Sequence, residues 1–413
     1  MTELEFAKKI RELGGTAYLV GGAVRDKFRG VEAHDRDYCV TGIDEKTFAD
    51  AFVDAEKFGK SFPVYSVEID ETHCEVAFAR TEKKVSSGYR GFEILFSPTV
   101  TIEQDLYRRD TTINAMAIEL LTGALIDPFG GRADVLDKKI RAVSEHFTDD
   151  PVRALRAARQ AAQFGFDICA DTVDAMKLCG DELAREPTER IFDELATALK
   201  TDKPSIFFRS LERADLLAVT FPEIANLRGK VQPTAFHPEG DAYEHTLNLV
   251  DAVAAVNPKP IVRFAALMHD IGKGATPPEM LPHHYKHELR GLDVLRRMNR
   301  RMTLPGDWKK AAAFVIGEHM RAPRLSHAGK IVDLLLNLSA QKISVRDFCD
   351  IINADNHGLP PYLEHAQEII GELLKVGGRD APPELRGEDV GNWIRAERIR
   401  RFVTLKNFRK EAF

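Results

Sequence analysis

The 413-residue sequence has few cysteines, and no two of them form a C-x-x-C pair. The five stand at positions 39, 74, 169, 179 and 349. An odd number without close spacing argues against a disulfide scaffold and against a cysteine-rich zinc site. Such usage fits a reducing compartment, and we expect the protein in the cytoplasm.

Two further features are missing. The chain has 58 Lys and Arg against 64 Asp and Glu, a net charge of −6, which excludes a chain-wide basic coat for nucleic acid. Any nucleic-acid binding must then use a local basic patch. No stretch approaches the ~18–20 apolar residues of a membrane span. The first nine residues carry charges where a signal peptide would be apolar, so no membrane partner is expected.

Two regimes follow one another along the chain, whose length suggests two to four domains. Up to about residue 140, short β-like runs alternate with helical patterns, and from about 148 onward the spacing is helical without a convincing strand. Pro233, Pro238 and Gly240 indicate a boundary near 225–240. The polar segment 81–92 suggests a mobile loop. The expected strands include 18–20, 37–40, 64–67, 76–78 and a pair, 117–120 and 124–126, joined by a Thr122-Gly123 turn.

An apolar run at 18–20 leads into Gly21-Gly22 and then into a helix expected to start near Ala23. Glycines at a strand-to-helix turn let backbone N–H groups approach a phosphate, and the helix N-terminus adds a positive dipole end. Arg25 in the first turn can reach the same anion. This segment predicts a phosphate-binding turn, although Gly-Gly alone is more often a simple tight turn.

Two carboxylates follow, Asp35 and Asp37, at the expected start of the next strand. Period-two alternation places them on one face. Two close carboxylates repel each other unless a cation lies between them, and Mg²⁺ prefers such oxygen ligands. We therefore predict a two-magnesium catalytic site at Asp35 and Asp37, with ions about 3.5–4 Å apart. Glu75 on a neighbouring strand is the candidate third carboxylate.

The motifs together resemble class II tRNA nucleotidyltransferases and their relatives, the bacterial poly(A) polymerases. The resemblance covers roughly residues 16–230. It rests on Leu19-Val-Gly-Gly-Ala-Val-Arg-Asp26 with Asp35-Arg-Asp37, on Arg108-Arg-Asp-Thr-Thr-Ile-Asn-Ala-Met-Ala117, on Asp127-Pro-Phe-Gly-Gly131, on the helix Asp149-Asp-Pro-Val-Arg-Ala-Leu-Arg-Ala-Ala-Arg159 and on Pro187-Thr-Glu-Arg-Ile191.

The resemblance implies an α+β fold, in which a nucleotidyltransferase head with a small mixed β-sheet and helices precedes an all-α neck. The helical region that follows carries His245, His269-Asp270 and Asp355, which resemble the motif of HD phosphohydrolases and imply an all-α HD domain. We expect the head at 1–140, a neck with a nucleotide-selecting helix at 141–228, the HD domain at 229–360 and a helical tail at 361–413. The implied activity is template-independent addition of CCA to tRNA 3′ ends from CTP and ATP, with Mg²⁺ as cofactor and pyrophosphate as leaving group.

Arg153, Arg156 and Arg159 are spaced i, i+3 and i+6, so they cover about a third of a helix circumference. Such a strip of guanidinium groups suits a triphosphate and a base edge. Asp150 before Pro151 is also a standard helix N-cap. The resemblance implies that Asp150 and Arg153 present a base-pairing edge to cytosine or adenine.

Arg109 carries over as a nucleotide contact, together with Gly22 and Arg25. Asp110 either orients the nucleotide or caps the next helix. Two positions depart from the family pattern: Asp149 stands for Glu, and Gln160 for Phe.

Nine of the thirteen histidines fall within residues 237–357, where an even spread would give about four. His245, the pair His269-Asp270 and Asp355 lie on three expected helices. They resemble the ligand set of HD phosphohydrolases, and imidazole with carboxylate suits a divalent ion. His284, His287 and His319 are additional candidates for metal or phosphate contact. The bound ion is expected to be a transition metal of unknown identity or Mg²⁺.

An HD domain joined to a nucleotidyltransferase resembles the long bacterial form of the CCA-adding enzyme, and implies phosphatase, 2′-nucleotidase and 2′,3′-cyclic phosphodiesterase activity on tRNA ends. The expected partners are tRNA, ATP and CTP, with a monomer or homodimer as assembly. The basic residues of segment 386–413 form either an RNA-binding face or the solvated side of a terminal helix. The alternatives for function are a poly(A) polymerase, a partial CC- or A-adding enzyme, and an HD phosphohydrolase with an RNA-binding front half.

Overall fold

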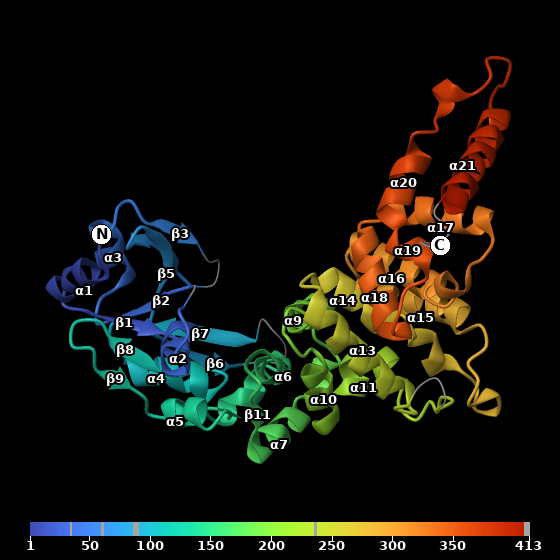
Figure 1. Ribbon diagram of the computed structural model, residues 1–413. Coiled ribbons are helices and arrows are strands. Elements are labelled where there is room, and N and C mark those ends of the chain that lie inside the picture. The colour runs from blue at the N-terminus through green and yellow to red at the C-terminus, as the bar shows by residue number, and fades with distance from the viewer. Residues whose placement is uncertain (34, 59–61, 86–90, 235–237, 409–413) are drawn as a thin grey trace. The chain divides into compact units, whose positions relative to one another are not determined.

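The computed structural model describes residues 1–33, 35–58, 62–85, 91–234 and 238–408. These residues form a mixed α+β structure in which all but the smallest strands lie in the first part of the chain (Figure 1). The chain divides into two compact units, Met1–Glu194 with Ile206–Thr220 and Leu195–Ser205 with Phe221–Phe413. The α+β class expected from the sequence is confirmed.

A seven-stranded sheet organises the first unit, in the order β3-β4-β5-β2-β1-β8-β9. Its pairs are antiparallel except for β2 and β5, which run parallel. Two further pairs, β6 with β7 and β10 with β11, lie outside this sheet. The bounds are β1 Thr16–Val20, β2 Asp37–Thr41, β3 Glu56–Phe58, β4 Val64–Ile69, β5 Thr72–Phe78, β6 Arg80–Lys84, β7 Phe92–Phe96, β8 Ala117–Glu119, β9 Leu125–Ile126, β10 Lys139–Ile140 and β11 Asp167–Ile168.

Three sequence expectations about strands need correction. Strand β2 begins at Asp37, so Asp35 lies in the segment before it and not on a strand face. Residues 81–84, expected in a mobile loop, continue strand β6, which pairs with β7; residues 86–90 of that loop lie outside the described part. The two-residue strand β11 interrupts the helical half, because its backbone pairs with β10.

Both faces of the main sheet are covered, because alternate side chains of its central strands point to opposite sides. Tyr38 and Val40 of β2 belong to one apolar cluster, which also contains residues of α1 and α3. Cys39 belongs to a second cluster, which also contains residues of α4. The helices of this part are α1 Glu3–Glu12, α2 Gly22–Arg29, α3 Glu45–Ala51, α4 Ile102–Tyr107, α5 Gly131–Leu136, α6 Val152–Phe164, α7 Ala170–Leu178, α8 Gly180–Leu183, α9 Thr188–Ala198, α10 Ser205–Arg213 and α11 Leu217–Thr220.

The second unit is helical within its described residues, and α13, α14, α16 and α18 pack around one apolar core (Figure 1). Long apolar runs such as 264–268 form these helices because the chain buries them on several sides. The helices are α12 Pro222–Ala225, α13 Ala242–Val256, α14 Pro260–Met268, α15 His287–Met302, α16 Gly306–Glu318, α17 Ala328–Ser339, α18 Val345–Asn356, α19 Pro361–Glu364, α20 Ala366–Leu374 and α21 Glu388–Phe408.

The basic residues of α21 are largely engaged within the unit. Arg395 pairs with Asp333 at 2.7 Å, Arg401 pairs with Glu372 at 2.6 Å, and Arg398 donates to the Val376 carbonyl at 3.0 Å. These contacts favour the terminal-helix interpretation of this segment. Arg409 and Lys410 lie outside the described residues. Among the helices that the structure describes, none is both long and apolar enough to span a bilayer.

Candidate active sites

The turn between β1 and α2 brings backbone close to charged side chains. Gly21 has φ of +68°, and a Cβ atom there would lie 3.2 Å from Nη1 of Arg109. The positive φ favours glycine at this position, and a Cβ there would also press on the Arg109 guanidinium. Arg25 donates from Nη1 to Oδ1 of Asn114 at 2.7 Å, and its guanidinium lies 4.3 Å from the centre of the Phe164 ring. These contacts hold Arg25 at the turn.

Three carboxylates influence one another beside this turn. Asp37 on β2 is the register partner of Glu75 on β5. Although Asp37 and Glu75 are exposed, the partial loss of hydration beside the sheet raises the pKa of both. For Asp37 the charge of Arg109 opposes this shift and that of Asp35 adds to it; for Glu75 the charges of Asp37 and Asp35 add to it. The mutual repulsion expected from the sequence is therefore present, although Asp35 lies outside the strand.

The oxygen atoms of these carboxylates lie farther apart than the ligand atoms of a metal site built from protein side chains alone. Among the described residues, the groups that bring three metal-ligand atoms within 4.8 Å of one another are both in the second unit. Mg²⁺ keeps several waters and uses only one or two carboxylates together with substrate phosphates. The open arrangement of Asp37 and Glu75 suits that ion better than a metal that needs a full set of protein ligands.

One open cavity of about 620 Å³ joins the turn, the carboxylates and helix α6. Its lining is rich in arginine, with seven arginines against three carboxylates, and acidic residues beside the lining, among them Glu82, Asp105 and Glu194, pair with several of these arginines. An acidic chain thus concentrates positive charge at one place, as a triphosphate site requires. The lining residues are Gly21, Gly22, Arg25, Asp37, Glu75, Arg80, Arg108, Arg109, Asp110, Asn114, Arg153, Arg156, Arg159 and Gln163.

Asp110 is a buried anchor for the arginine helix. Its Oδ2 pairs with Arg156 at 3.0 Å and accepts from Nε2 of Gln160 at 3.1 Å, and its Oδ1 accepts from the backbone N–H of Thr111 at 2.8 Å. Burial raises the pKa of Asp110, but the charge of Arg156 and the Thr111 hydrogen bond lower it to about 2. Asp110 thus orients an arginine of the cavity and does not cap a helix.

Asp150 stands at the start of α6 but does not line the cavity. Its Oδ1 accepts from the backbone N–H of Val152 at 3.2 Å, and its Oδ2 pairs with Arg190 at 2.8 Å. Arg153 lines the cavity and donates to the His146 carbonyl at 2.6 Å. The capping role foreseen for Asp150 is therefore present, and Arg190 fixes the other carboxylate oxygen.

Several residues of this site were missed at the sequence level. Asp105, 1% exposed, accepts from Arg108 at 2.6 Å and from Arg109 at 3.0 Å. The i+3 and i+4 spacing of these arginines from Asp105 was a visible signal. Glu82 on β6 pairs with Arg80 at 2.9 Å and with Arg108 at 3.0 Å, and no local pattern indicates that contact.

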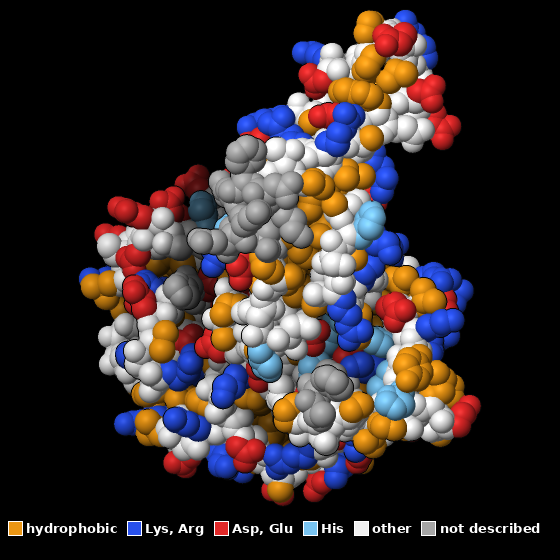
Figure 2. Space-filling view, turned by 45° about the vertical axis from the view of Figure 1, so that its right-hand side comes forward, with side chains coloured by type: hydrophobic (Ala, Val, Ile, Leu, Met, Phe, Trp, Pro, Cys, Tyr) orange, Lys and Arg blue, Asp and Glu red, His pale blue; other side chains and the backbone are white. Residues whose placement is uncertain are grey.

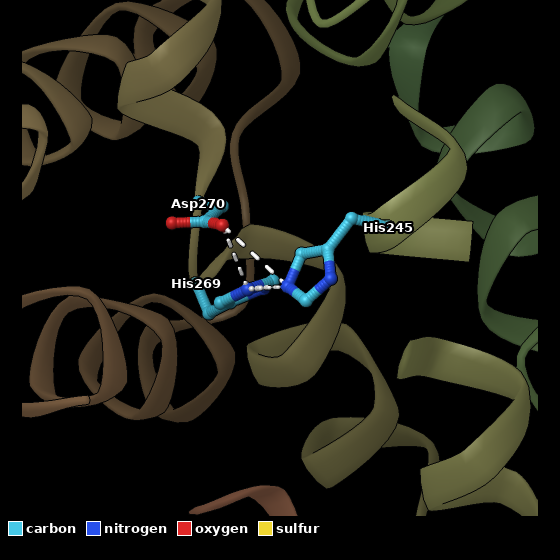
Figure 3. Close-up of side chains that lie close together, drawn as sticks. All are labelled: His245, His269 and Asp270. Carbon is cyan, nitrogen blue, oxygen red and sulfur yellow. Dashed lines mark hydrogen bonds and ion pairs between the residues drawn. The ribbon is translucent and has the colours of Figure 1, made fainter. Parts of the chain in front are cut away.

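A second cluster lies in the helical unit. His245 on α13, His269 at the end of α14 and the adjacent Asp270 point toward one another (Figure 3). Asp270 also belongs to a group with His287 and His319, so that one carboxylate is common to two sets of three ligand atoms. Oδ2 of Asp270 lies 3.1 Å from Nε2 of His269, and Oδ1 lies 3.1 Å from Nε2 of His287.

The histidines are oriented as metal ligands. Nδ1 of His269 donates to the Ala266 carbonyl, Nδ1 of His287 to the His284 carbonyl, and Nδ1 of His319 to the Val315 carbonyl. The remaining one, His245, uses Nδ1 to contact Glu239. An imidazole that donates from Nδ1 presents a lone pair at Nε2.

In the neutral form, which is the form that binds a metal, the four imidazoles therefore present two pairs of facing lone pairs at Nε2; the hydrogen bond of His245 to Asp355 belongs to the protonated form. The Nε2 atoms of His245 and His269 are 3.3 Å apart, and those of His287 and His319 are 3.2 Å apart. Facing lone pairs repel unless a cation binds both. The edge of a tetrahedron with metal–nitrogen bonds of ~2.0–2.1 Å is about 3.3–3.4 Å. Oδ1 of Asp270 is buried and has no hydrogen-bond partner. The donor set thus fits two divalent cations that share Asp270.

The negative charges of Asp270 and Asp355 act on the histidines of this cluster. Burial lowers the pKa of His245, but the hydrogen bond with Asp355 at 3.1 Å and the charge of Asp270 raise it overall. Burial raises the pKa of Asp355, but the hydrogen bond with His245 and the charge of His269 lower it to about 2. The charge that draws a proton to His245 also favours a divalent cation.

His284 joins neither group, in contrast to His287 and His319. Its Nδ1 accepts from Oγ1 of Thr276 at 2.8 Å and its Nε2 donates to the Val231 carbonyl at 3.1 Å, so we leave it out of the ligand set. Glu239 and Lys273 contact the cluster but were not foreseen. Lys273 lies three residues after Asp270, in the same short motif, and was a visible signal, whereas Glu239 lies outside that motif. Histidine side chains reach the surface among lysines and arginines on one face of the molecule (Figure 2).

Comparison with known families divides the chain into three matched regions. The poly A polymerase head domain matches residues 17–141. A model described as the probable RNA- and SrmB-binding site of polymerase A matches residues 165–227. The HD domain matches residues 242–403. The first cavity lies in the head and at the start of the helices that follow it, and the histidine cluster lies in the HD region.

Curated relatives match nearly the whole chain. The multifunctional CCA protein of Thioalkalivibrio sulfidiphilus is 37% identical over 94% of this chain and 98% of its own. That of Methylococcus capsulatus is 44% identical over 79% of this chain and 77% of its own. Among solved structures, the Bacillus stearothermophilus CCA-adding enzyme in complex with CTP has a TM-score of 0.67 and 22% identity, covering 98% of this chain and 92% of that one. A CCA-adding enzyme in complex with ATP has a TM-score of 0.64 and 21% identity over 97% and 89%. At these identities the solved structures establish the fold.

Proposed function

The chain belongs to the family of multifunctional CCA proteins, and from that membership we propose that it adds C, C and A to the 3′ ends of tRNA from CTP and ATP and releases pyrophosphate. The observation that carries this proposal is the single cationic cavity that holds the glycine turn, Asp37 with Glu75, and the arginines of α6. A site that only bound RNA would have no use for repelling carboxylates among those arginines.

The cavity residues have different roles in this reaction. Gly21 and Gly22 let the backbone approach the triphosphate, and Arg25 and Arg109 bind its oxygens. Asp35 and Asp37 would hold Mg²⁺, with Glu75 as the third carboxylate. When bound, Mg²⁺ neutralises charge on the α-phosphate and on the leaving pyrophosphate.

The arginine helix supplies the rest. Arg156, held by Asp110, and Arg159, held by Glu194 at 2.6 Å, lie along one strip of α6 and bind the nucleotide. Arg153 presents hydrogen-bonding groups to the base from the cavity lining, and Asp150, beside the lining at the start of α6, would use the lone pairs that Val152 and Arg190 leave free. Their side chains are preorganised by Arg190 and by the His146 carbonyl, so little rotamer freedom is lost on binding.

We assign these roles to four segments of the chain: the head at 1–140, the neck with the selecting helix at 141–228, the HD domain at 229–360 and the tail at 361–413. The tRNA 3′ end must then reach the cavity that the first two segments line together. A truncated chain of residues 1–228 that still incorporates CTP would support the division between neck and HD domain.

Incubation of the full chain with tRNA that lacks CCA and with all four nucleotides tests the first function. Addition of three residues of sequence CCA is the expected result. A long homopolymer would instead identify a poly(A) polymerase, and addition of CC alone or A alone would identify a partial enzyme.

A second activity is favoured by the four imidazole lone pairs around Asp270. We propose that this cluster hydrolyses phosphate esters at damaged tRNA ends, as a phosphatase, 2′-nucleotidase and 2′,3′-cyclic phosphodiesterase. His245, His269, Asp270 and Asp355 would hold one divalent ion, and Asp270, His287 and His319 a second. Imidazole-rich sites suit transition metals better than Mg²⁺. When bound, such ions activate water and polarise the phosphoryl group.

The chain's own residues prepare this site in three ways. Backbone carbonyls and Glu239 fix the tautomers of the histidines, Asp270 offers one oxygen to each set of ligands, and Lys273, 2.5 Å from Oδ2 of Asp270, adds positive charge where a phosphate would bind. The substitutions His269→Ala and Asp270→Ala should abolish release of phosphate from cyclic nucleotides while CTP incorporation survives. Retained release in both variants would overturn the assignment.

A further inference from the structure

A short arm of the chain precedes the region that matches the HD domain, and it reaches the histidine cluster. We define the arm as the described residues 230–234 and 238–241. The backbone N–H of Gln232 donates to the Gly240 carbonyl at 2.9 Å, and Val231 forms an antiparallel bridge with Asp241. His284 of the helical unit donates to the Val231 carbonyl. The arm is thus anchored to the unit by backbone contacts.

Gln232 is the arm residue that faces Lys273. Both side chains are buried, with Gln232 2% and Lys273 5% exposed. Nζ of Lys273 donates to Oε1 of Gln232 and also to Oδ2 of Asp270, at 2.5 Å from the latter. The Lys273 side chain therefore links Gln232 to Asp270, the carboxylate that both candidate ligand groups share.

The contact with Lys273 fixes the orientation of the Gln232 amide. A lysine ammonium has donors and no acceptor, so the atom that faces Nζ must be the amide oxygen. The amide nitrogen Nε2 then points elsewhere, and it is buried without a hydrogen-bond partner. An unsatisfied buried donor costs about 1–3 kcal/mol, and native proteins contain few of them. The donor is thus left without an acceptor, on a side chain whose oxygen meets the lysine that contacts Asp270.

We propose that Gln232 binds a phosphoryl oxygen of the phosphate ester at the HD centre, through Nε2. The proposal rests on the phosphohydrolase function proposed above and adds a substrate contact from outside the region that matches the HD domain. The ligand must carry acceptors, because Nε2 is a donor. It must also be anionic, because the Lys273 ammonium and the ions that would sit on Asp270 surround the position with positive charge. A phosphate ester meets both requirements.

Two variants separate a phosphate contact from a structural role. Gln232→Glu keeps an oxygen that can accept from Lys273 but replaces the donor by a negative oxygen. Gln232→Met has similar length and neither donor nor acceptor. Gln367→Glu introduces the same charge at an exposed position of α20 and serves as the matched control. CTP incorporation by each full-length variant reports whether the first unit is folded, and thermal unfolding reports whether the second unit is.

The readout is the binding of inorganic phosphate to the full chain loaded with Mn²⁺, measured by calorimetry. A saturating non-hydrolysable CTP analogue fills the head cavity, whose arginines would otherwise bind phosphate as well. Metal content is measured for each variant. We expect phosphate to bind at least about tenfold more weakly to Gln232→Glu, because this variant loses the donor and its negative charge repels phosphate. Phosphate should also bind more weakly to Gln232→Met, which loses the donor alone. Gln367→Glu should bind as the original chain does.

The outcomes separate this inference from the proposed activity. Unchanged phosphate binding in Gln232→Glu overturns the inference, and so does a loss confined to Gln232→Met, since Gln232 would then act only by holding Lys273. Absence of phosphate binding in the original chain also overturns it. Gln232-dependent phosphate binding without hydrolysis of cyclic nucleotides would uphold the subsite and refute the phosphohydrolase function.

Discussion

Asp37 on β2 lies directly opposite Glu75 on β5, in the parallel pairing at the centre of the sheet. These two residues are 38 positions apart in the sequence, yet both line the arginine-rich cavity. Partial loss of hydration and the negative charge of Asp37 raise the pKa of Glu75, and a cation bound between the two carboxylates would relieve their repulsion. This relationship leads to the first prediction.

Asp37→Asn should reduce CTP incorporation by at least about 100-fold. The Mg²⁺ that would stabilise the charge of the transition state would lose one of its carboxylate ligands. Asp35→Ala should act in the same direction, and the melting temperature of both variants should stay close to that of the original chain. Incorporation of labelled CTP into tRNA lacking CCA measures the effect. Asp54→Asn, an exposed carboxylate without a site contact, is the control. Normal incorporation by Asp37→Asn would refute the metal assignment.

The low pKa of Asp110 predicts a dependence of stability on pH. A carboxyl whose pKa falls from its usual value to about 2 on folding stabilises the protein above the unfolded pKa, and this contribution disappears as the pH falls from about 4 to about 2. The contribution at neutral pH is about 2 kcal/mol. In the Asp110→Asn variant this part of the acid sensitivity should be absent. The difference in melting temperature between the original chain and Asp110→Asn should therefore shrink from pH 5 to pH 4 to pH 3. A difference that stays the same at all three pH values would contradict the prediction.

Gln160→Leu removes a hydrogen bond from buried Asp110 and leaves Thr111 without its partner on Gln160, because Oγ1 of Thr111 donates to Oε1 of Gln160 at 2.8 Å. We expect a loss of about 1–3 kcal/mol, seen as a lower midpoint in thermal unfolding. Gln163→Leu, on the exposed side of the same helix, should leave the midpoint nearly unchanged. Equal midpoints for the two variants would show that Gln160 is not part of the Asp110 anchor.

Glu239→Ala should weaken metal binding at the HD centre, because the carboxylate beside Nδ1 fixes the tautomer and orientation of His245. Loss of such a partner lowers metal affinity roughly 10–100-fold. Metal content after dialysis against a graded chelator measures it, with Glu279→Ala, an exposed residue of the same unit, for comparison. CTP incorporation should not change. Retention of metal by Glu239→Ala equal to that of Glu279→Ala would count against the role of Glu239.

Local motifs in the sequence were sufficient to point to the glycine turn, the arginine helix and the His269-Asp270 pair, and they indicated Asp35 and Asp37 although Asp35 lies before the strand. Each of these patterns lies within a dozen residues, where the period of a strand or helix dictates which side chains share a face. Asp105 could have been found in the same way, because two arginines follow it at helical spacing. The error about residues 81–84 arose because a polar strand that pairs outside the main sheet shows little hydrophobic alternation.

By itself the sequence determined the family and the α+β class, and it predicted the candidate residues of each site, because these depend on residue types at short spacing. Only the tertiary structure decided that Glu75 pairs with Asp37 and that Gln160 supports Asp110. It also decided that His287 and His319, but not His284, join the candidate ligand groups, that Glu239 contacts His245, and that Gln232 contacts Lys273. Those relationships depend on strand register and on the packing of distant segments, which hydrophobic burial and backbone pairing establish only when the whole chain has folded.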